Sequence, residues 1–462
     1  MDKRYPLIAA AVAAAVASYH VDAQPTLAQA QSPVASLVIA GSSAAAPGFE
    51  IAIEKDLCGG SGATPGSATL AISSVGGSKN FLAYSCATGA TFGSIPSGSI
   101  ITVYYRTEGG SVVGALPLVN NTSIKRLDLS NSTCATSTST DGTGAQIATC
   151  TVTGTTSVVG TSDGWSGAVT ADTVQLGITD VEPGQLVGAD YPSAYGTYFG
   201  TATPAQMGSL THSRLFDQVF GFLVNTQQGN GLTAGQAINL SEQSAKAILS
   251  GYTDWNAIPD ALTGSPIGSS SATNNLVLIN REQGSGTRTS ANIYFLRYGC
   301  GSTNAISSSG LGNFSTGDEL TQANTTPGAI AYASIDNKLN PANSSKYTNL
   351  TLATINGVTP SNLAAATGQY GWWFEATAVI PTGGITVTNS ATLANELIGK
   401  VEELSYAPAI PDVLAIPGIG ATVNSPTTAL TNNGGSGTTE IYTNPYTRGG
   451  NSCNVASLET PQ

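Results

Sequence analysis

The amino-acid sequence predicts a mixed α/β fold with two domains. Strand-like apolar runs alternate with helical segments, and several of these strands end in a glycine-containing turn that opens a helix. The chain of 462 residues is long enough for two well-filled cores. Such an alternation favours helices layered on a sheet, with ligand-binding residues where the strands end.

The first part of the chain contains three strands that run into such turns. A strand at 36–40 leads into the small-residue segment 41–47 and a helix reaching about Asp56. A strand at 100–106 ends in the glycine turn 108–113, and a strand at 174–178 ends at Thr179-Asp180. Each turn alone is equally consistent with a plain connection, and Asp180 alone could simply cap the next turn.

The segment from about 120 to 162 interrupts this pattern. It is crowded with Ser and Thr and contains Cys134 and Cys150. We interpret it as an exposed, β-rich insertion that is closed by a disulfide and lies outside the basic fold.

The second part of the chain continues the alternation. Ser241 is a good N-cap for a helix that ends near Ser250, and Pro360-Ser361-Asn362 opens another helix. The remaining strands are predicted at 219–225, 276–279, 329–332 and 371–376.

The segment 280–288, Asn-Arg-Glu-Gln-Gly-Ser-Gly-Thr-Arg, carries the clearest functional pattern. It follows an apolar strand and opens a helix expected from Thr287 to about Tyr298. Free N–H groups of a first helical turn bind anions, Ser285 and Thr287 add hydroxyl donors, and Arg281 adds a forked positive charge. The spacing is not that of a P-loop. The pattern therefore predicts an oxyanion site.

The alternative is an ordinary glycine-rich loop, because the chain has 54 glycines. The same Gly-Ser-Gly-Thr string recurs at 435–438, where Asn432 replaces the arginine and a strand-like segment with Pro445 follows. We expect a hairpin or loop there, and the anion site only at the first copy.

The composition restricts where the protein works and what it binds. A basic start followed by an Ala/Val-rich run to about Ala17 predicts a signal peptide of residues 1–23, with a second small-residue cleavage site as late as residue 30. No later segment suits a membrane span, so a periplasmic or secreted bacterial protein is expected. A net charge of −12 with only 16 Lys and Arg argues against nucleic-acid binding.

Six cysteines suit an exported chain. They permit fifteen pairings, of which proximity suggests Cys58–Cys86 and Cys134–Cys150, leaving Cys300–Cys453. There is no CxxC pair, and His212 is the only histidine after the signal peptide, so no metal site is predicted. His212 is expected in a surface turn just before a strand.

Taken together, these residues resemble the periplasmic phosphate-binding protein of the phosphate ABC transporter. The resemblance covers most of the mature chain and is most specific at Arg281-x-x-Gly284-Ser285-Gly286-Thr287. It includes Thr179-Asp180, the helix from Asn239 to Trp255 and the run from Thr326 to Tyr332. The run from Arg448 to Cys453 is similar to the C-terminal signature of a larger, secreted branch.

The resemblance implies a type II periplasmic-binding-protein fold, in which two α/β lobes close over a ligand. The first lobe would comprise residues 34–200 and 372–462, with the insertion at about 120–162, and the second lobe residues 201–371. Crossing strands near 180–191 and 372–376 would form the hinge.

The resemblance also implies the ligand contacts. Arg281, Ser285, Gly286 and Thr287 would hold phosphate from the second lobe, and Ser43, Ala44 and Ser111 from the first. Asp180 would accept the proton of hydrogenphosphate and so discriminate against sulfate. Two positions depart from the family: Ser43-Ala44 stands where Thr-Phe is usual, and Gln283 replaces the aspartate that steadies the arginine.

The sequence therefore predicts an exported binding protein for inorganic phosphate, with an inner-membrane ABC permease as partner and no cofactor. One alternative is an extracellular or surface protein of this fold with an adhesive, matrix or structural role. Another is a phosphate-ester hydrolase that uses Ser285 or Ser111 as nucleophile. The hydrolase would have only His212 as histidine base, so no enzymatic activity is predicted.

Overall fold

A computed structural model of the chain describes residues 24–59, 68–76, 80–141, 144–154, 163–186, 188–191, 193–227, 230–269, 275–308, 312–313, 315–335, 337, 346–402, 413–414 and 444–458. The predicted signal peptide and the second Gly-Ser-Gly-Thr string lie outside these residues.

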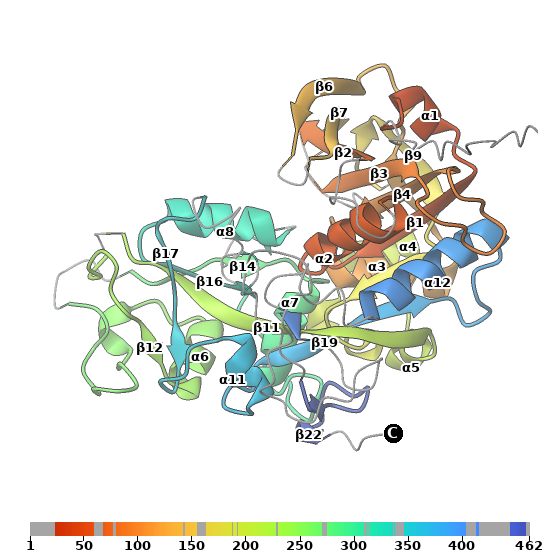
Figure 1. The fold of residues 1–462 in the computed structure, drawn as a ribbon. Coiled ribbons are helices and arrows are strands. Elements are labelled where there is room, and N and C mark those ends of the chain that lie inside the picture. The colour runs from red at the N-terminus through yellow and green to blue at the C-terminus, as the bar shows by residue number, and fades with distance from the viewer. Residues whose placement is uncertain are drawn as a thin grey trace, which may run out of the picture.

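Two α/β lobes are joined through one continuous mixed sheet (Figure 1). Within the described residues this sheet has 14 strands, of which eleven follow the order β13-β16-β11-β19-β10-β1-β4-β3-β2-β7-β6. The long strands β11 (Thr211–Asn225) and β19 (Trp373–Ile380) pair antiparallel and run from one lobe into the other. The fold is therefore the mixed α/β arrangement that the sequence predicts.

The first lobe contains the elements that precede β11. In chain order they are α1 (Leu27–Gln31), β1 (Ala35–Gly41), α2 (Ala46–Ala52), η1 (Ile53–Leu57), β2 (Thr69–Gly76), β3 (Phe81–Ala87), β4 (Ile100–Arg106), α3 (Gly110–Asn120), β5 (Ser123–Leu127), β6 (Ala135–Thr140), β7 (Gln146–Thr153), β8 (Ser166–Gly167), β9 (Val169–Thr173), β10 (Leu176–Thr179), η2 (Pro183–Gln185), η3 (Gly188–Asp190), α4 (Ser193–Phe199) and α5 (Pro204–Gly208).

The second lobe contains most of the elements between β11 and β19. They are β12 (Asn239–Leu240), α6 (Glu242–Leu249), η4 (Trp255–Ala257), β13 (Val277–Leu278), β14 (Asn280–Arg281), α7 (Gly286–Ala291), η5 (Asn292–Leu296), β15 (Gly312–Asn313), α8 (Thr316–Thr325), β16 (Ala329–Ser334), β17 (Leu350–Leu352), β18 (Thr354–Ile355) and α11 (Asn362–Ala366). After β19 come α12 (Thr388–Glu402), β20 (Val413–Leu414), β21 (Tyr446–Thr447) and β22 (Ser457–Leu458).

Strand β1 shows why the sheet lies inside the first lobe. Leu37 and Ile39 pack on one side against α2 and α12, and Val38 and Ala40 pack on the other side in the core that includes α3. β1 also pairs in parallel with both β4 and β10. A strand buried on both faces reads as a continuous apolar run, which is how the sequence reads at 36–40.

Helix α12 returns the chain to the first lobe after β19. Leu393, Ala394 and Leu397 are buried in the same core as Leu37 and Phe49, and Figure 1 shows the helix lying along this lobe. The C-terminal part of the chain therefore contributes to the lobe that the N-terminal part begins.

Two details differ from the sequence-based expectations. His212 lies within β11, paired with Val379, and not in a turn before the strand. The segment 180–191 forms the short helical turns η2 and η3, so β11 and not this segment crosses with β19. The sequence did not predict the strand at 211–218, because polar side chains occupy the exposed beginning of β11.

The insertion is only partly separate from the basic fold. β6 is exposed over most of its length, as expected, but β7 pairs in parallel with β2 and buries Ala148, Cys150 and Val152. The insertion therefore extends the edge of the main sheet. Its alternation of small apolar residues with Thr is a strand pattern that the Ser/Thr-rich composition obscures.

Candidate functional site

The predicted strand, turn and helix form around Arg281. β14 ends at Arg281, Gly284 takes a φ of 94°, and α7 begins at Gly286. Ser285 is the N-cap residue, and its Oγ accepts the N–H of Arg288 at 3.3 Å. The helix continues directly through η5 and ends at Leu296, with Arg297 as its C-cap, two residues before the predicted end. Ser285 thus has a capping role that the sequence analysis did not assign.

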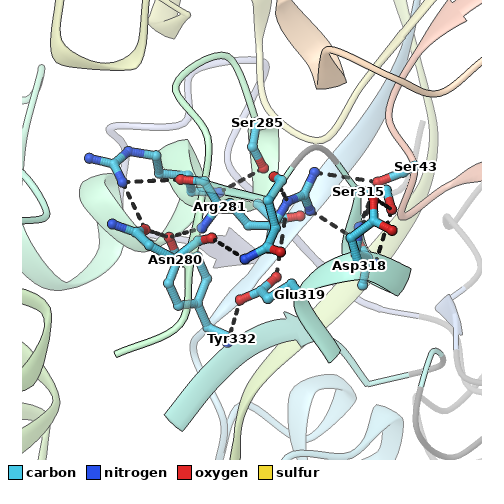
Figure 2. Close-up of polar contacts among 12 residues, drawn as sticks. Ser43, Asn280, Arg281, Ser285, Ser315, Asp318, Glu319 and Tyr332 are labelled. Carbon is cyan, nitrogen blue, oxygen red and sulfur yellow. Dashed lines mark hydrogen bonds and ion pairs between the residues drawn. The ribbon is translucent and has the colours of Figure 1, made fainter. Parts of the chain in front are cut away.

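Arg281 is buried and lies where the two lobes meet. Its Nη1 donates to Thr316 Oγ1 at 3.0 Å and its Nη2 to Ser43 Oγ at 3.4 Å, while Nε donates to the carbonyl of Asn313 at 3.2 Å. Ser43 belongs to the first lobe and Thr316 to the second. Figure 2 shows the guanidinium reaching toward Ser43 beside the start of α8. The forked charge is therefore presented between the lobes.

Asp180 lies at the end of β10 with its carboxylate buried, 2% exposed. Its Oδ1 accepts the hydroxyl of Ser42, and its Oδ2 accepts Thr287 Oγ1 at 3.3 Å. Burial raises the pKa of Asp180, and the hydrogen bond from Ser42, the charge of Arg281 and the bonds from Thr287 oppose that rise. A carboxylate of the first lobe thus lies against the N-terminal turn of α7 in the second.

The lobes meet through small residues. A Cβ on Gly286 would lie 2.3 Å from Ser111 Oγ and 2.8 Å from Asp180 Oδ2, so only glycine allows this approach. The N–H of Val112 donates to the carbonyl of Gly284 at 3.0 Å. The first turn of α3 therefore packs directly on the turn before α7.

Ser111 reaches Asp180 because α3 lies close to β10. The Cβ of an alanine at Gly177 would lie 2.0 Å from the carbonyl oxygen of Gly114, so the glycine pair brings helix and strand together. Ser111 Oγ then accepts the N–H of Asp180 at 3.1 Å. Five of the eight residues proposed as ligands therefore form one buried contact group: Asp180, Ser111, Ser285, Gly286 and Thr287.

The two remaining first-lobe residues of the prediction have different surroundings. Ser43 lies opposite α8, where its Oγ accepts the N–H of Thr316 at 3.3 Å. The N–H of Ala44 donates to Ser42 Oγ at 3.1 Å, and its side chain is buried. Ala44 therefore belongs to the turn that holds Ser42 against Asp180.

Sequence reasoning missed Ser42, Thr316 and Glu319. Ser42 was passed over in favour of its neighbour Ser43, although both carry the same hydroxyl. Thr316 and Glu319 belong to α8, whose N-cap Ser315 accepts the N–H of Asp318 at 3.1 Å. A Ser followed by two acidic residues in the first turn is a helix-start signal, and it could have located α8.

Neither Glu282 nor Gln283 is the acidic partner of Arg281. Gln283 is exposed, and Glu282 lies against the first lobe, where Tyr195 donates to its Oε2 at 3.5 Å. Burial, reinforced by the nearby charge of Glu108, raises the pKa of Glu282 well above its usual value. Glu319 is paired with Arg281, with its Oε2 4.0 Å from Arg281 Nε.

The structure contains three disulfides in its described part. They are Cys58–Cys86 and Cys134–Cys150, the pairs that proximity suggested, and Cys300–Cys453, the pair that this left. The last joins the turn after η5 to the C-terminal segment 444–458, across 153 positions of sequence.

His212 lies apart from the anion motif. Its Nδ1 is 3.1 Å from the carbonyl oxygen of Leu210, and it borders a cavity of about 240 Å³ at the back of the crossing strands. The cavity is lined by Glu182, His212, Arg214, Glu375, Thr377, Arg448, Gly450 and Ser452. None of these is one of the serines that the hydrolase alternative requires.

Three carboxylates also gather in the first lobe. One ligand oxygen from each of Glu50, Glu54 and Asp141 lies within 4.8 Å of the others. Burial, with the charge of Asp141, raises the pKa of Glu50 to about 7. The sequence analysis did not anticipate this acidic cluster because Asp141 is distant from the two glutamates in the chain.

The helices that the structure describes include none with the length and apolar character needed to cross a membrane.

Comparison with known proteins gives one family match. Residues 218–398 match a family model described as a PBP superfamily domain. This range runs from the second half of β11 through the second lobe into α12, so it includes the predicted anion motif and all of β19. No curated protein matches the chain.

Solved structures give only distant similarities. A protein from Clostridium perfringens with bound phosphate has 12% identity and a TM-score of 0.43, over 80% of this chain and 95% of that chain. A phosphate-binding protein from Stenotrophomonas maltophilia has 13% identity and a TM-score of 0.36, over 75% and 78%. An ABC-type phosphate transport receptor from Vibrio cholerae has 14% identity and a TM-score of 0.31, over 50% and 75%.

Residues 218–398 thus match a PBP superfamily domain, and the described residues form two α/β lobes, an arrangement consistent with the type II periplasmic-binding-protein fold that the sequence predicts.

Proposed function

We propose that the protein is an exported solute-binding protein that captures inorganic phosphate between its two lobes. The observation that carries the proposal is the position of Arg281, a buried guanidinium whose Nη1 and Nη2 donate to hydroxyls of both lobes. The oxygens of a tetrahedral anion can replace these hydroxyl oxygens as hydrogen-bond acceptors. The forked geometry of the guanidinium suits such an anion.

The proposed ligand set is Arg281, Ser285, Gly286 and Thr287 from the second lobe, with Ser43, Ala44, Ser111 and Asp180 from the first. Asp180 is the acceptor in a site that otherwise consists of donors. An oxyanion that keeps a proton can donate to it, whereas sulfate would place an unprotonated oxygen against a carboxylate.

We propose lobe boundaries at 34–200 plus 372–462 for the first lobe and 201–371 for the second. The packing of α4 and α5 against α3, and of α12 against β1, supports the two ends of the second lobe. Opening would take place by bending of β11 and β19, the strands that connect the lobes.

We also propose that the signal peptide ends at Ala23. Ala30 is fully buried and its carbonyl accepts Thr102 Oγ1 at 2.9 Å, so cleavage near residue 30 would remove a packed helix. The mature protein would then begin at Gln24, which N-terminal sequencing of the exported protein would test. An ABC permease would be the partner for uptake, and phosphate-uptake assays in a deletion strain would test that role.

Calorimetry of the mature protein with phosphate and with sulfate tests the proposed function. We expect phosphate to bind and sulfate to bind at least ten times more weakly. Arg281→Gln should abolish measurable phosphate binding, because it removes the positively charged guanidinium that donates to hydroxyls of both lobes. Arg126→Gln, which changes a partly exposed arginine on β5, should leave binding unchanged. Equal binding of sulfate and phosphate, or none of either, would contradict the proposal.

No catalytic role is proposed. The only histidine of the mature chain borders the cavity behind the crossing strands, and Ser285 is engaged as a helix cap. A preparation of the mature protein should release no phosphate from phosphate monoesters above the uncatalysed rate.

A further inference from the structure

A buried carboxylate lies behind the arginine of the proposed anion site. Glu319, in the first turn of α8, is fully buried, and its Oε2 is 4.0 Å from Arg281 Nε. Its Oε1 accepts the N–H of Tyr332 at 3.0 Å, which fixes the carboxylate against β16. Oε2 has no hydrogen-bond partner within the described residues. Glu319 therefore acts on Arg281 through its charge and position.

The other contacts hold the arginine in one place. The backbone N–H of Arg281 donates to the hydroxyl of Tyr332 at 3.2 Å, and that hydroxyl in turn donates to Asn280 Oδ1. Arg288 Nη1 donates to the same Asn280 oxygen at 2.7 Å. Figure 2 shows Glu319, Tyr332 and Asn280 on one side of Arg281, and Ser43 on the other. The guanidinium thus lies between Glu319, near its Nε, and the first-lobe residue Ser43, near its Nη2.

We propose that Glu319 positions the Arg281 guanidinium and that its charge sets how strongly the site between the lobes holds an anion. This inference rests on the proposed function. A charged Glu319 offsets part of the field of Arg281 at the anion, whereas a neutral Glu319 leaves that field intact. Gln283, in the turn next to Arg281, is exposed and uncharged. The side chain that changes the field of Arg281 is therefore Glu319 on α8.

The surroundings make Glu319 able to change charge near neutral pH. Burial raises its pKa to about 8, and the charge of Arg281 and the hydrogen bond from Tyr332 oppose the rise. The groups that face it are Arg281 on β14 and Tyr332 on β16, with Arg288 on α7 acting through Tyr332. Asp318 on its own helix is exposed and turned to Ser315. Below about pH 8 Glu319 is mainly protonated, and above it the carboxylate opposes anion binding.

Phosphate affinity measured by calorimetry at pH 7.5 and pH 9.5 tests the charge effect. Dianionic phosphate predominates at both values, so a change in affinity reports on the protein. Wild-type protein should bind about tenfold more weakly at pH 9.5, because the ionised Glu319 then opposes the anion. Glu319→Gln keeps the acceptor for Tyr332 but cannot ionise, so it should bind as wild type at pH 7.5 and lose most of the decline. Asp318→Asn removes a charge one residue away and should keep the full decline.

Glu319→Ala separates positioning from charge. Relative to Glu319→Gln, it should weaken binding at both pH values, because both variants lack the charge and only Gln keeps an acceptor for the N–H of Tyr332. An unchanged pH decline in Glu319→Gln, or equal binding by Glu319→Ala and Glu319→Gln, would overturn the proposal.

A ligand-free measurement separates this inference from the proposed function. The carboxyl carbon of Glu319 can be titrated by NMR in the wild type and in Arg281→Gln. Because Arg281 lowers the pKa of Glu319, its midpoint should move to higher pH in the variant. If the midpoint moves but no form binds phosphate, the proposed function fails and the pairing stands. If the midpoint does not move, the pairing itself is wrong.

Discussion

At the scale of single residues, we propose that Asp180 decides what kind of anion the site prefers. It is the acceptor among donors, and each of its carboxylate oxygens receives a hydroxyl, one from Ser42 of its own lobe and one from Thr287 of the other. The sequence analysis placed this aspartate at the end of a strand but could not choose between ligand contact and turn capping. The structure puts its side chain between the lobes, where burial raises its pKa.

Asp180→Asn should reverse part of the selectivity. An amide can donate to an unprotonated oxygen, so sulfate binding should strengthen while phosphate binding weakens by about 1.5–3 kcal/mol, the usual value for a hydrogen bond to a charged group. Calorimetry with both anions would measure the ratio. Asp254→Asn, at an exposed cap outside the site, is the control. An unchanged ratio in Asp180→Asn would show that this carboxylate does not select the ligand.

At the scale of elements, the close approach of α3, β10 and α7 builds the site. Gly114 and Gly177 let α3 lie against β10, and Gly286 lets α7 approach both. These contacts join elements that are far apart in the chain, and each depends on the absence of a side chain. The lobes can therefore meet closely enough for Thr287 to reach Asp180.

Gly286→Ala should prevent that approach without damaging the helix. Alanine favours helix formation, but its Cβ would overlap Ser111 Oγ, so phosphate affinity should fall at least tenfold while the unfolding midpoint changes little. Gly317→Ala, in the first turn of α8, meets no atom closer than 3.8 Å and should bind as wild type. Wild-type affinity in Gly286→Ala would show that the lobes do not meet this closely in the bound state.

At the scale of the whole molecule, the C-terminal segment 444–458 ties the two lobes together behind the crossing strands. Arg448 lies 4.5 Å over the ring of Phe374 in β19 and donates to the carbonyls of Gly371 and Trp373. Ser452 exchanges hydrogen bonds with Glu182, and Cys453 is bonded to Cys300 of the second lobe.

Removing this long-range disulfide should cost more stability than removing a local one. Chain entropy predicts a loss of about 5 kcal/mol for Cys300→Ser with Cys453→Ser, whose loop spans 153 positions, against about 3 kcal/mol for Cys134→Ser with Cys150→Ser, which spans 16. Urea unfolding of the two double variants would measure both losses. An equal or reversed order would contradict the entropic account.

Buried carboxyls should make the protein more stable at mildly acidic than at alkaline pH. Burial raises the pKa of Glu50 and Asp190 to about 7, of Asp217 to about 6 and of Glu319 to about 8. The folded state then binds protons more tightly than the unfolded chain, so this stability is complete below about pH 4 and is lost as pH rises to about 8. Calorimetric melting at pH 5 and pH 8.5 should show a lower Tm at the higher pH, and the opposite order would contradict the prediction.

The sequence by itself determined the α/β class, most strands and helices, and the motif around Arg281. It could do so because these features depend on neighbours in the chain: apolar runs, caps such as Ser241 and Ser361, and glycines next to an arginine. The cysteine pairs followed from proximity for two disulfides and from elimination for the third. The fold class was therefore the easiest part of the prediction.

Only the tertiary structure decided which residues share the site. Ser42 and Thr316 lie more than 270 positions apart, and Glu319 has no sequence pattern that connects it with Arg281. The crossing strand was misplaced at 180–191 because the exposed, polar beginning of β11 hides its strand character. A local sequence pattern predicts the structure of one segment. Contacts between the lobes depend on which residues lack a side chain at the interface, and a local pattern does not show which residues lie there.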